Sequence, residues 1–278
     1  MKFVDVKNDI AFRKIFGNEN HKESLISFLN AILAFDESDK IIEVNILNPY
    51  QLPKLRGGKV SILDVRATDQ QKRQFIVEMQ VAEKDGFDKR VLYYLTNGYN
   101  SQIKSADQYR KLMPAYFVGI LSEFSHTKNP HYISRNRITD IDTGEVTIKD
   151  IEFNFIELEK FNKKVEDLST LSDKWIYFIK NAENLEVIPQ NTNDKGLLYA
   201  YQEAQKHLWT QEELDAYNYT DMREEDARAE LDAKLKKAEN KGKIKGRVEV
   251  AKSMKAKGFD NEIIVELTGL TIQEINDL

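Results

Sequence analysis

The sequence predicts an α/β protein in which a mixed sheet of the order αβββαβ precedes a helical carboxy-terminal region. Two observations predict the sheet domain. Apolar residues recur at helical spacing in residues 7–34 and 88–104, and short apolar or alternating runs lie between and after them. The third observation is the density of Glu, Lys, Ala and Leu late in the chain. We therefore expect a first domain over residues 1–158 and a helical region over residues 159–278.

The helices of the first domain are predicted from apolar faces and from the residues that interrupt them. Residues 7–34 predict two helices separated at Gly17 and Asn18, and residues 88–104 predict a third helix. Because residues three and four apart share a helix face, this third helix is expected to face the sheet with Leu92, Leu95, Tyr99 and Ile103.

The strands are predicted from short apolar runs that end at turn residues. Residues 41–47 form one such run, residues 59–80 contain two joined by a polar turn, and residues 113–121 are continuously apolar. Residues 125–158 alternate apolar and polar side chains around an Asp-Thr-Gly turn, so a further pair of strands is expected to extend or cap the sheet.

The last third of the chain predicts long and short helices. Residues 211–257 favour either one long helix or two interrupted at Gly242 and Gly246. The basic run within them, from Lys234 to Arg247, is interpreted as a solvated helix face rather than as a DNA contact. Residues 258–278 predict two short helices that resemble a helix-turn-helix unit, which we interpret as a packing or dimerisation element because it carries little basic charge.

Composition excludes several classes of protein. The net charge of −5 argues against binding of nucleic acid by bulk basicity. The absence of cysteine excludes disulfides and thiolate zinc sites, and the four histidines have no metal-ligand spacing. No apolar run is long enough to span a membrane, and the amino terminus lacks the apolar segment of a secretory signal, so a cytoplasmic protein is expected.

The chemistry of the chain centres on residues 59–80, where two predicted strands each end their apolar run on an acid. Asp64 ends the first run, and Glu78 and Gln80 lie on one face of the second because side chains alternate along a strand. If these strands pair as neighbours, Asp64 and Glu78 converge. Two carboxylates so placed suit a hard divalent cation such as Mg²⁺. Taken alone, the same acids are also compatible with a strand-end turn and a salt-bridged edge residue.

Three stretches of the sequence carry a resemblance to a known family. They read DVKNDIAFRKIFGNENHKESLISFLNAIL near the amino end, LDVRATD followed by IVEMQ, and RVLYYLTNGYNSQI beyond. They resemble the Rpn family of recombination-promoting nucleases and putative transposases, within the PD-(D/E)xK nuclease superfamily. Leu63 stands where the superfamily name has Pro, and Gln80 stands where it has Lys. The resemblance implies that Glu-x-Gln is the usual form in this family.

The resemblance also implies an activity and the residues that perform it. It implies a Mg²⁺-dependent DNA endonuclease linked to recombination, transposition or mobile elements, with Mn²⁺ as a substitute ion. It implies that Asp64, Glu78 and the carbonyl of Met79 hold the metal, and that an acid of the first helix, Asp9 before Glu23, joins the site.

Other side chains are candidates for contacts to the substrate. Gln80 can orient water or a phosphate oxygen but has no charge. Arg90 and Lys59 are the candidates for contact with a DNA phosphate, with Lys72 as a further substitute for the missing lysine. Tyr94 and Gln102 are candidates to line the same cleft.

Two other functions stay open from the sequence. One is a catalytically weak or inactive nuclease fold that acts as an interaction or DNA-binding protein and oligomerises, for example as a homodimer, through its helical region. The other is a sequence-specific DNA binder that needs no metal. Serine, cysteine or zinc hydrolysis finds no support in the residues present.

Overall fold

The computed structural model describes residues 2–51 and 61–278, which fall into two compact units, Met1–Thr220 and Asp221–Leu278. The first unit extends beyond residue 158, where the first domain was expected to end. It does so because two further helices, α4 (Leu171–Asn181) and α5 (Lys195–Glu203), share the core of the sheet domain. Within the described residues, no helix is long and apolar enough to cross a membrane.

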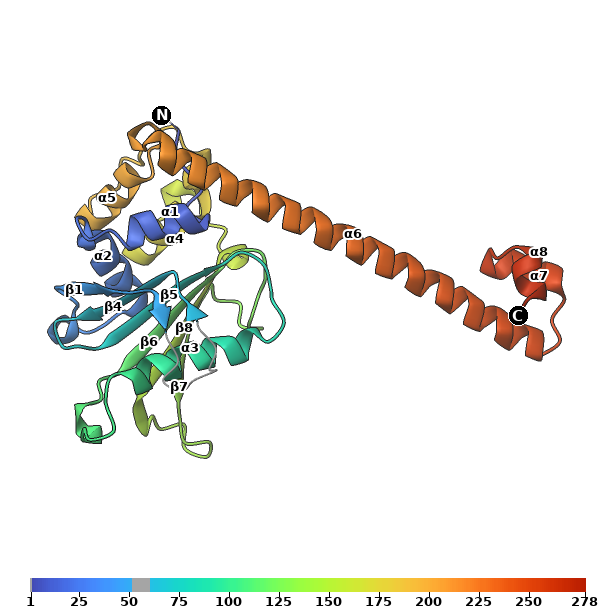
Figure 1. Cartoon of the computed structure of the whole chain (residues 1–278), viewed down its shortest axis with the longest axis horizontal. Helices are drawn as coiled ribbons and strands as arrows, with labels where there is room; N and C mark the ends of the chain where they lie inside the picture. Colours follow the sequence, from blue (N-terminus) through green and yellow to red (C-terminus); the bar gives the residue numbers. More distant parts are fainter. Residues whose placement is uncertain (1, 52–60) are drawn as a thin grey trace. The chain divides into compact units, whose positions relative to one another are not determined.

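A six-stranded mixed sheet forms the centre of the first unit (Figure 1), with strand order β1-β4-β5-β6-β8-β7. Strands β1, β4 and β5 are antiparallel, β5, β6 and β8 run parallel, and β7 pairs antiparallel with β8. The strands are β1 (Val44–Leu47), β4 (Val65–Asp69), β5 (Gln74–Gln80), β6 (Ala115–Leu121), β7 (Ile133–Ile138) and β8 (Ile148–Glu157). Strands β2 (Tyr50–Gln51) and β3 (Ser61–Ile62) form a separate pair. The predicted mixed α/β architecture is therefore confirmed.

Helices cover both faces of this sheet. One face carries α1 (Asp9–Phe16), α2 (Lys22–Leu33), α4 and α5, and the opposite face carries α3 (Phe87–Ser101). Trp175 of α4 lies at the centre of the larger core, fully buried against Phe16 and Phe28, and its indole N–H donates to Ser27 Oγ at 2.9 Å. Aromatic packing thus fixes α1 against α2 and α4.

The sheet-facing side of α3 differs from the predicted one. Leu92 was expected to face the sheet, but its side chain is 52% exposed, whereas Phe87, Val91, Leu95 and Gly98 are buried. The helix begins at Phe87, and the buried positions follow this residue at spacings of four, four and three. Leu95 is buried as predicted and Tyr99 packs against the same core, so the prediction was wrong at Leu92, whose place is taken by Val91. Arg90 and Tyr94 of this helix line a pocket together with Glu78 and Gln80 of β5.

The second unit has a small core of its own. The helix α6 (Gln211–Ala256) is a single helix that Gly242 and Gly246 do not interrupt, and it is followed by α7 (Asn261–Thr268) and α8 (Ile272–Asn276). The short helices turn at Gly269, whose φ of +65° is a left-handed conformation that glycine adopts without strain. The buried apolar side chains described in this unit are Ala251, Ile264, Leu270 and Ile275.

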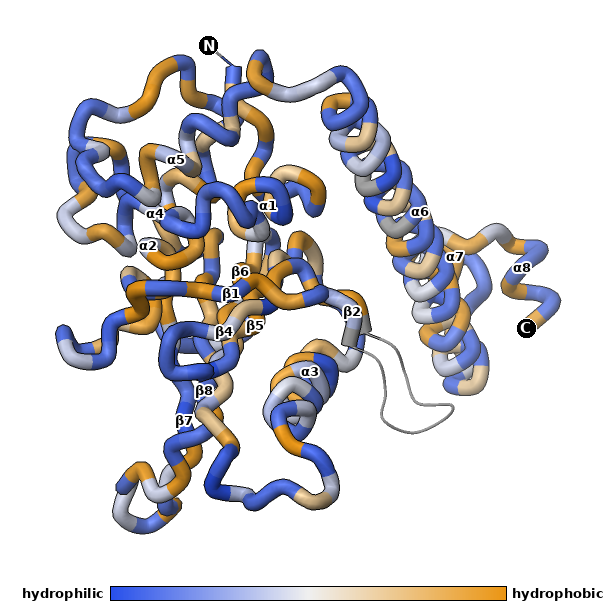
Figure 2. The backbone as a smooth tube through the Cα atoms, turned by 60° about the vertical axis from the view of Figure 1, so that its left-hand side comes forward, coloured by the Kyte–Doolittle hydropathy of each residue, from blue (hydrophilic) through white to orange (hydrophobic). Residues whose placement is uncertain are grey.

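Hydropathy along the backbone follows this division (Figure 2). Hydrophobic segments gather on the strands and on the helices that cover them, whereas α6 is mostly hydrophilic or intermediate in colour. Side chains described in the middle of α6 are exposed, as expected for a helix dense in Glu and Lys.

Candidate active site

The register of β4 and β5 brings Asp64 and Glu78 together. Val65 pairs with Val77 in the antiparallel ladder, so the residue before Val65 lies opposite the residue after Val77. Val77 belongs to the core beneath α1 and α2, so Glu78 alternates to the face that carries α3, and Asp64 lies in the bend directly before β4. The convergence of these two acids, which the sequence made conditional on strand pairing, is present in the structure.

Reciprocal hydrogen bonds hold the two carboxylates in place. The backbone N–H of Asp64 donates to Glu78 Oε1 at 3.0 Å, and the backbone N–H of Met79 donates to Asp64 Oδ2 at 2.9 Å. The side chain of Met79 is buried in the core. Among the described residues, no group donates a hydrogen bond to Glu78 Oε2. Within the described part of the chain, this oxygen of Glu78 therefore has no hydrogen-bond donor.

Burial and mutual repulsion disfavour the charged forms of both acids. Burial, followed by the charge of Asp64, raises the pKa of Glu78 well above its ordinary value of 4.5. Burial and the charge of Asp9 likewise raise the pKa of Asp64, although the Met79 N–H and Arg13 oppose this shift. A cation between the two carboxylates would relieve both effects, so the pair is electrostatically suited to a divalent ion.

The raised pKa of Glu78 predicts a pH-dependent gain in stability for Glu78→Gln in metal-free protein. The folded state binds the Glu78 proton more tightly than the unfolded state does, so ionisation of Glu78 lowers the free energy of unfolding as pH rises through the raised pKa. Gln keeps the side-chain oxygen but never ionises. The variant should gain stability over the wild type at about pH 8 and gain less at about pH 5. Urea unfolding in EDTA at both pH values measures this difference, and an equal or reversed difference would contradict the expectation.

The amino-terminal helix contributes two charged side chains to this end of the sheet. Asn8 caps α1 by accepting from the N–H groups of Ile10 and Ala11, and Asp9 and Arg13 then lie one turn apart on the same face. Both Arg13 Nε and Nη2 donate to Asp64 Oδ1, at 3.3 and 2.9 Å. Asp9 is near enough for its charge to raise the pKa of Asp64. Arg13 was not predicted as a site residue from the sequence. The one feature that pointed to it is its spacing of four residues from Asp9, which places both side chains on the same helix face.

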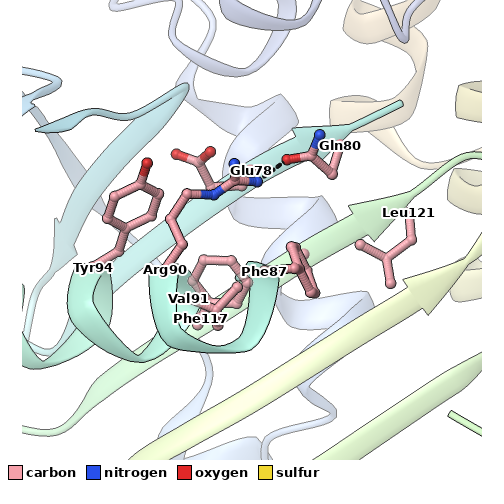
Figure 3. Close-up of a pocket in the computed structure, with 9 residues that line it drawn as sticks. Glu78, Gln80, Phe87, Arg90, Val91, Tyr94, Phe117 and Leu121 are labelled. Carbon is pink, nitrogen blue, oxygen red and sulfur yellow. Dashed lines mark hydrogen bonds between the residues drawn. The ribbon is translucent and has the colours of Figure 1, made fainter. Parts of the chain in front are cut away.

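Gln80 and Arg90 meet at the mouth of a small pocket between α3 and the ends of β5 and β6 (Figure 3). Arg90 Nη2 donates to Gln80 Oε1, and Gln80 Nε2 donates to the carbonyl of Ala82 at 2.8 Å. Glu78 and Tyr94 line the same small pocket, and most of its other lining residues are apolar. Burial and the charge of Glu78 raise the pKa of the Tyr94 hydroxyl.

Several other candidates lie away from this site. Glu23 pairs with Lys195 of α5, and Gln102 hydrogen-bonds both backbone groups of Met113 at the far end of α3. Lys72 lies in the turn between β4 and β5, at the opposite end of these strands from Asp64 and Glu78. The prediction of Lys72, which rested on its closeness in sequence, and that of Gln102, which rested on its helix face, were therefore wrong. Lys59 falls outside the described residues.

The oxygen donors at this end of the sheet fit a hard cation. Asp64 and Glu78 are carboxylates on facing strands, and the Met79 carbonyl follows directly in the chain. Within the described parts of the chain, no three acids or histidines are grouped closely enough to hold a metal, so Asp9 does not complete a set of three with this pair. Two carboxylates with one carbonyl leave the remaining positions of an octahedral ion to water and substrate, which is the usual arrangement for Mg²⁺.

Comparison with known proteins adds one finding. A protein-family model described as PD-(D/E)XK nuclease family transposase matches residues 6–234. The match spans α1, the whole six-stranded sheet and α3, and so includes every acid described above. No curated protein and no solved structure gives a match.

Proposed function

Because the chain belongs to the PD-(D/E)XK nuclease family transposases, as the resemblance read from its sequence implied, we propose that it is a Mg²⁺-dependent DNA endonuclease that hydrolyses phosphodiester bonds. Mn²⁺ is proposed as a substitute ion. The observation that carries the proposal is the pairing of Asp64 with Glu78 across two antiparallel strands. Their carboxylates are held by backbone N–H groups and disfavoured as free charges.

In this proposal Asp64, Glu78 and the Met79 carbonyl hold the metal. When bound, the ion would polarise the scissile phosphate and lower the pKa of a bound water. The protein keeps the carboxylates in position through the two reciprocal hydrogen bonds and the buried Met79 side chain. Asp9 adds negative charge behind this pair, which favours binding of a cation.

Gln80, Arg90 and Tyr94 form the substrate side of the proposed site. Gln80 is held by its contacts with Arg90 and the Ala82 carbonyl, so its role is to position Arg90 rather than to act as a charged group. Arg90 presents a guanidinium at the pocket mouth, where it can bind a phosphate oxygen of DNA. The Tyr94 ring closes the pocket beside Glu78.

Nicking of supercoiled plasmid tests the proposal. Purified protein with Mg²⁺ or Mn²⁺ should convert supercoiled plasmid to the open circular form, and excess EDTA should abolish the conversion. A single-stranded RNA of matched length, incubated in parallel, should be cleaved more slowly. Metal-independent nicking, or no nicking with either ion, would contradict the proposal.

The second candidate is an inactive nuclease fold that binds DNA or a protein. Two observations favour it: both oxygens of Asp64 accept hydrogen bonds from the protein, and the position of the superfamily lysine is the neutral Gln80. This candidate predicts DNA binding that does not change with metal and is not followed by nicking, so the plasmid assay combined with a binding assay separates the two.

For partners, we propose DNA as the substrate, in recombination, transposition or the biology of mobile elements, and a second copy of the chain through the helical carboxy-terminal region. The second unit exposes several large apolar side chains, which favours self-association. They are Phe259, Ile263, Leu267 and Ile272. Light scattering of the full chain and of Leu267→Glu measures this: the wild type should be a dimer and the variant a monomer.

A further inference from the structure

The contact between Arg13 and Asp64 joins two elements that lie far apart in the sequence. Two nitrogens of the guanidinium converge on a single oxygen, Asp64 Oδ1, at 3.3 and 2.9 Å. The carboxylate is almost inaccessible, with a side-chain exposure of 7%, whereas the Arg13 side chain is 40% exposed. The guanidinium therefore reaches the acid from the solvent side. It can leave Asp64 without any repacking of the core.

Arg13 sits where the proposed metal site lacks a positive side chain. Gln80 replaces the superfamily lysine, and its amide is already committed to Arg90 and to the Ala82 carbonyl. Among the described residues, Arg13 and Arg90 are the cations whose charges lower the pKa of Glu78. Arg90 approaches from α3 and contacts Gln80, whereas Arg13 approaches from α1 and contacts a proposed metal ligand directly.

Asp64 Oδ1 already accepts hydrogen bonds from both Nε and Nη2 of Arg13, so an ion that binds this oxygen must displace at least one of them. Binding of the ion would bring a positive charge to within a few ångströms of the guanidinium, and the two cations repel each other. Arg13 would then need a new anionic partner. A phosphate of DNA at the same site offers one, because the planar guanidinium matches two phosphate oxygens.

We propose that Arg13 is a displaceable cation: it neutralises Asp64 in the metal-free chain, yields this oxygen to the metal, and then binds the phosphate at the cleavage site. This inference rests on the proposed function and assigns to α1 the positive charge that Gln80 lacks. It makes Arg13 a competitor of the metal and a ligand of DNA. Removal of the Arg13 side chain should therefore raise the affinity for the metal and lower the affinity for DNA.

The experiment compares Arg13→Gln with Lys14→Gln. Lys14 is the next residue of the same helix, but its ammonium pairs with Glu213 and lies over the Trp209 ring, so the control removes the same charge without touching Asp64. Mn²⁺ affinity is measured by electron paramagnetic resonance without DNA. Arg13→Gln should bind Mn²⁺ about two- to fivefold more tightly than the wild type, as loss of a half-exposed ion pair implies. Lys14→Gln should bind Mn²⁺ like the wild type.

DNA affinity is measured by fluorescence anisotropy with Ca²⁺, a hard divalent cation, in place of Mg²⁺. Arg13→Gln should bind duplex DNA about tenfold more weakly than Lys14→Gln, because a charged hydrogen bond to phosphate is lost. Arg13→Lys keeps the positive charge but loses the planar guanidinium that can bind two phosphate oxygens, so it should recover part of the DNA affinity. It also provides the comparison if Arg13→Gln is poorly folded.

The results for the Arg13 variants test the role of Arg13, whereas Mn²⁺ binding by the wild type tests the proposed function. Unchanged or weaker Mn²⁺ binding by Arg13→Gln, in a chain whose wild type binds Mn²⁺ and nicks plasmid, overturns the role of Arg13 as a competitor. DNA affinity equal to that of Lys14→Gln overturns its phosphate contact. A wild type that binds no Mn²⁺ overturns the proposed function itself.

Discussion

Replacing Asp64 by Asn, or Glu78 by Gln, is expected to lower the rate of metal-dependent plasmid nicking by at least about 10²-fold. Each substitution keeps the shape of the side chain and removes one of the two negative charges that face each other across β4 and β5. Stabilisation of charge by a metal contributes several kcal/mol in enzymes that use one, and each 1.4 kcal/mol is about a tenfold change in rate. Quantifying open circular plasmid over time with Mg²⁺ measures the loss.

The control for this prediction is Glu83→Gln. Glu83 follows the same strand but is exposed and lies in the polar break before α3, so its loss of charge should leave nicking unchanged. Saturating Mn²⁺ should rescue neither site variant fully, because a carboxylate ligand is absent rather than weakened. Nicking by Asp64→Asn or Glu78→Gln at the rate of Glu83→Gln would mean that this acid pair is not the catalytic centre.

Replacing Trp175 by Ala is expected to lower the free energy of unfolding of the first unit by about 3–5 kcal/mol. The indole is fully buried among Phe16, Phe28 and Phe178, and it donates a hydrogen bond to Ser27. Truncation removes the aromatic contacts, leaves a cavity and leaves the Ser27 hydroxyl without this donor. Urea unfolding followed by far-ultraviolet circular dichroism measures the change without depending on tryptophan fluorescence.

The matched control for the core is Val187→Ala. Val187 is 72% exposed, so this substitution should lower the free energy of unfolding by less than about 0.5 kcal/mol. Trp175→Phe should fall between the two, because it keeps most of the apolar volume. A loss for Trp175→Ala no larger than that of Val187→Ala would contradict the packing of α4 against α1 and α2. That packing also positions Arg13, since Phe16 lies on the same short helix.

The strand elements of the site could be predicted from the sequence because their pattern is local. Alternation fixed the shared face of Glu78 and Gln80, and the short polar turn between the two strands made antiparallel pairing the simplest arrangement. The predicted strand that ends at Asp64 was wrong, because Ser61 and Ile62 pair with β2 and Asp64 lies directly before β4, next to the residue that pairs with Val77. The extension of the sheet by β7 and β8 was likewise predictable from a turn between two alternating runs.

The parts that escaped prediction depend on tertiary contacts. Arg13 lies 51 residues from Asp64, and no periodicity connects a helix side chain to a particular strand end. Leu92 was misplaced because Leu92 and Val91 are adjacent apolar residues, and only packing against the sheet decides which one is buried. Gln102 is polar, as a cleft residue would be, but its amide forms hydrogen bonds with the backbone N–H and carbonyl of Met113.

The central claim is that Asp64 and Glu78 hold a divalent metal, and anomalous X-ray diffraction from crystals grown with Mn²⁺ tests it most directly. We expect an anomalous peak between the two side chains, about 2.1 Å from an oxygen of each, with the Arg13 guanidinium moved off Asp64 Oδ1. Crystals in saturating Mn²⁺ that show no peak between these carboxylates, with Arg13 still bonded to Asp64, would contradict it.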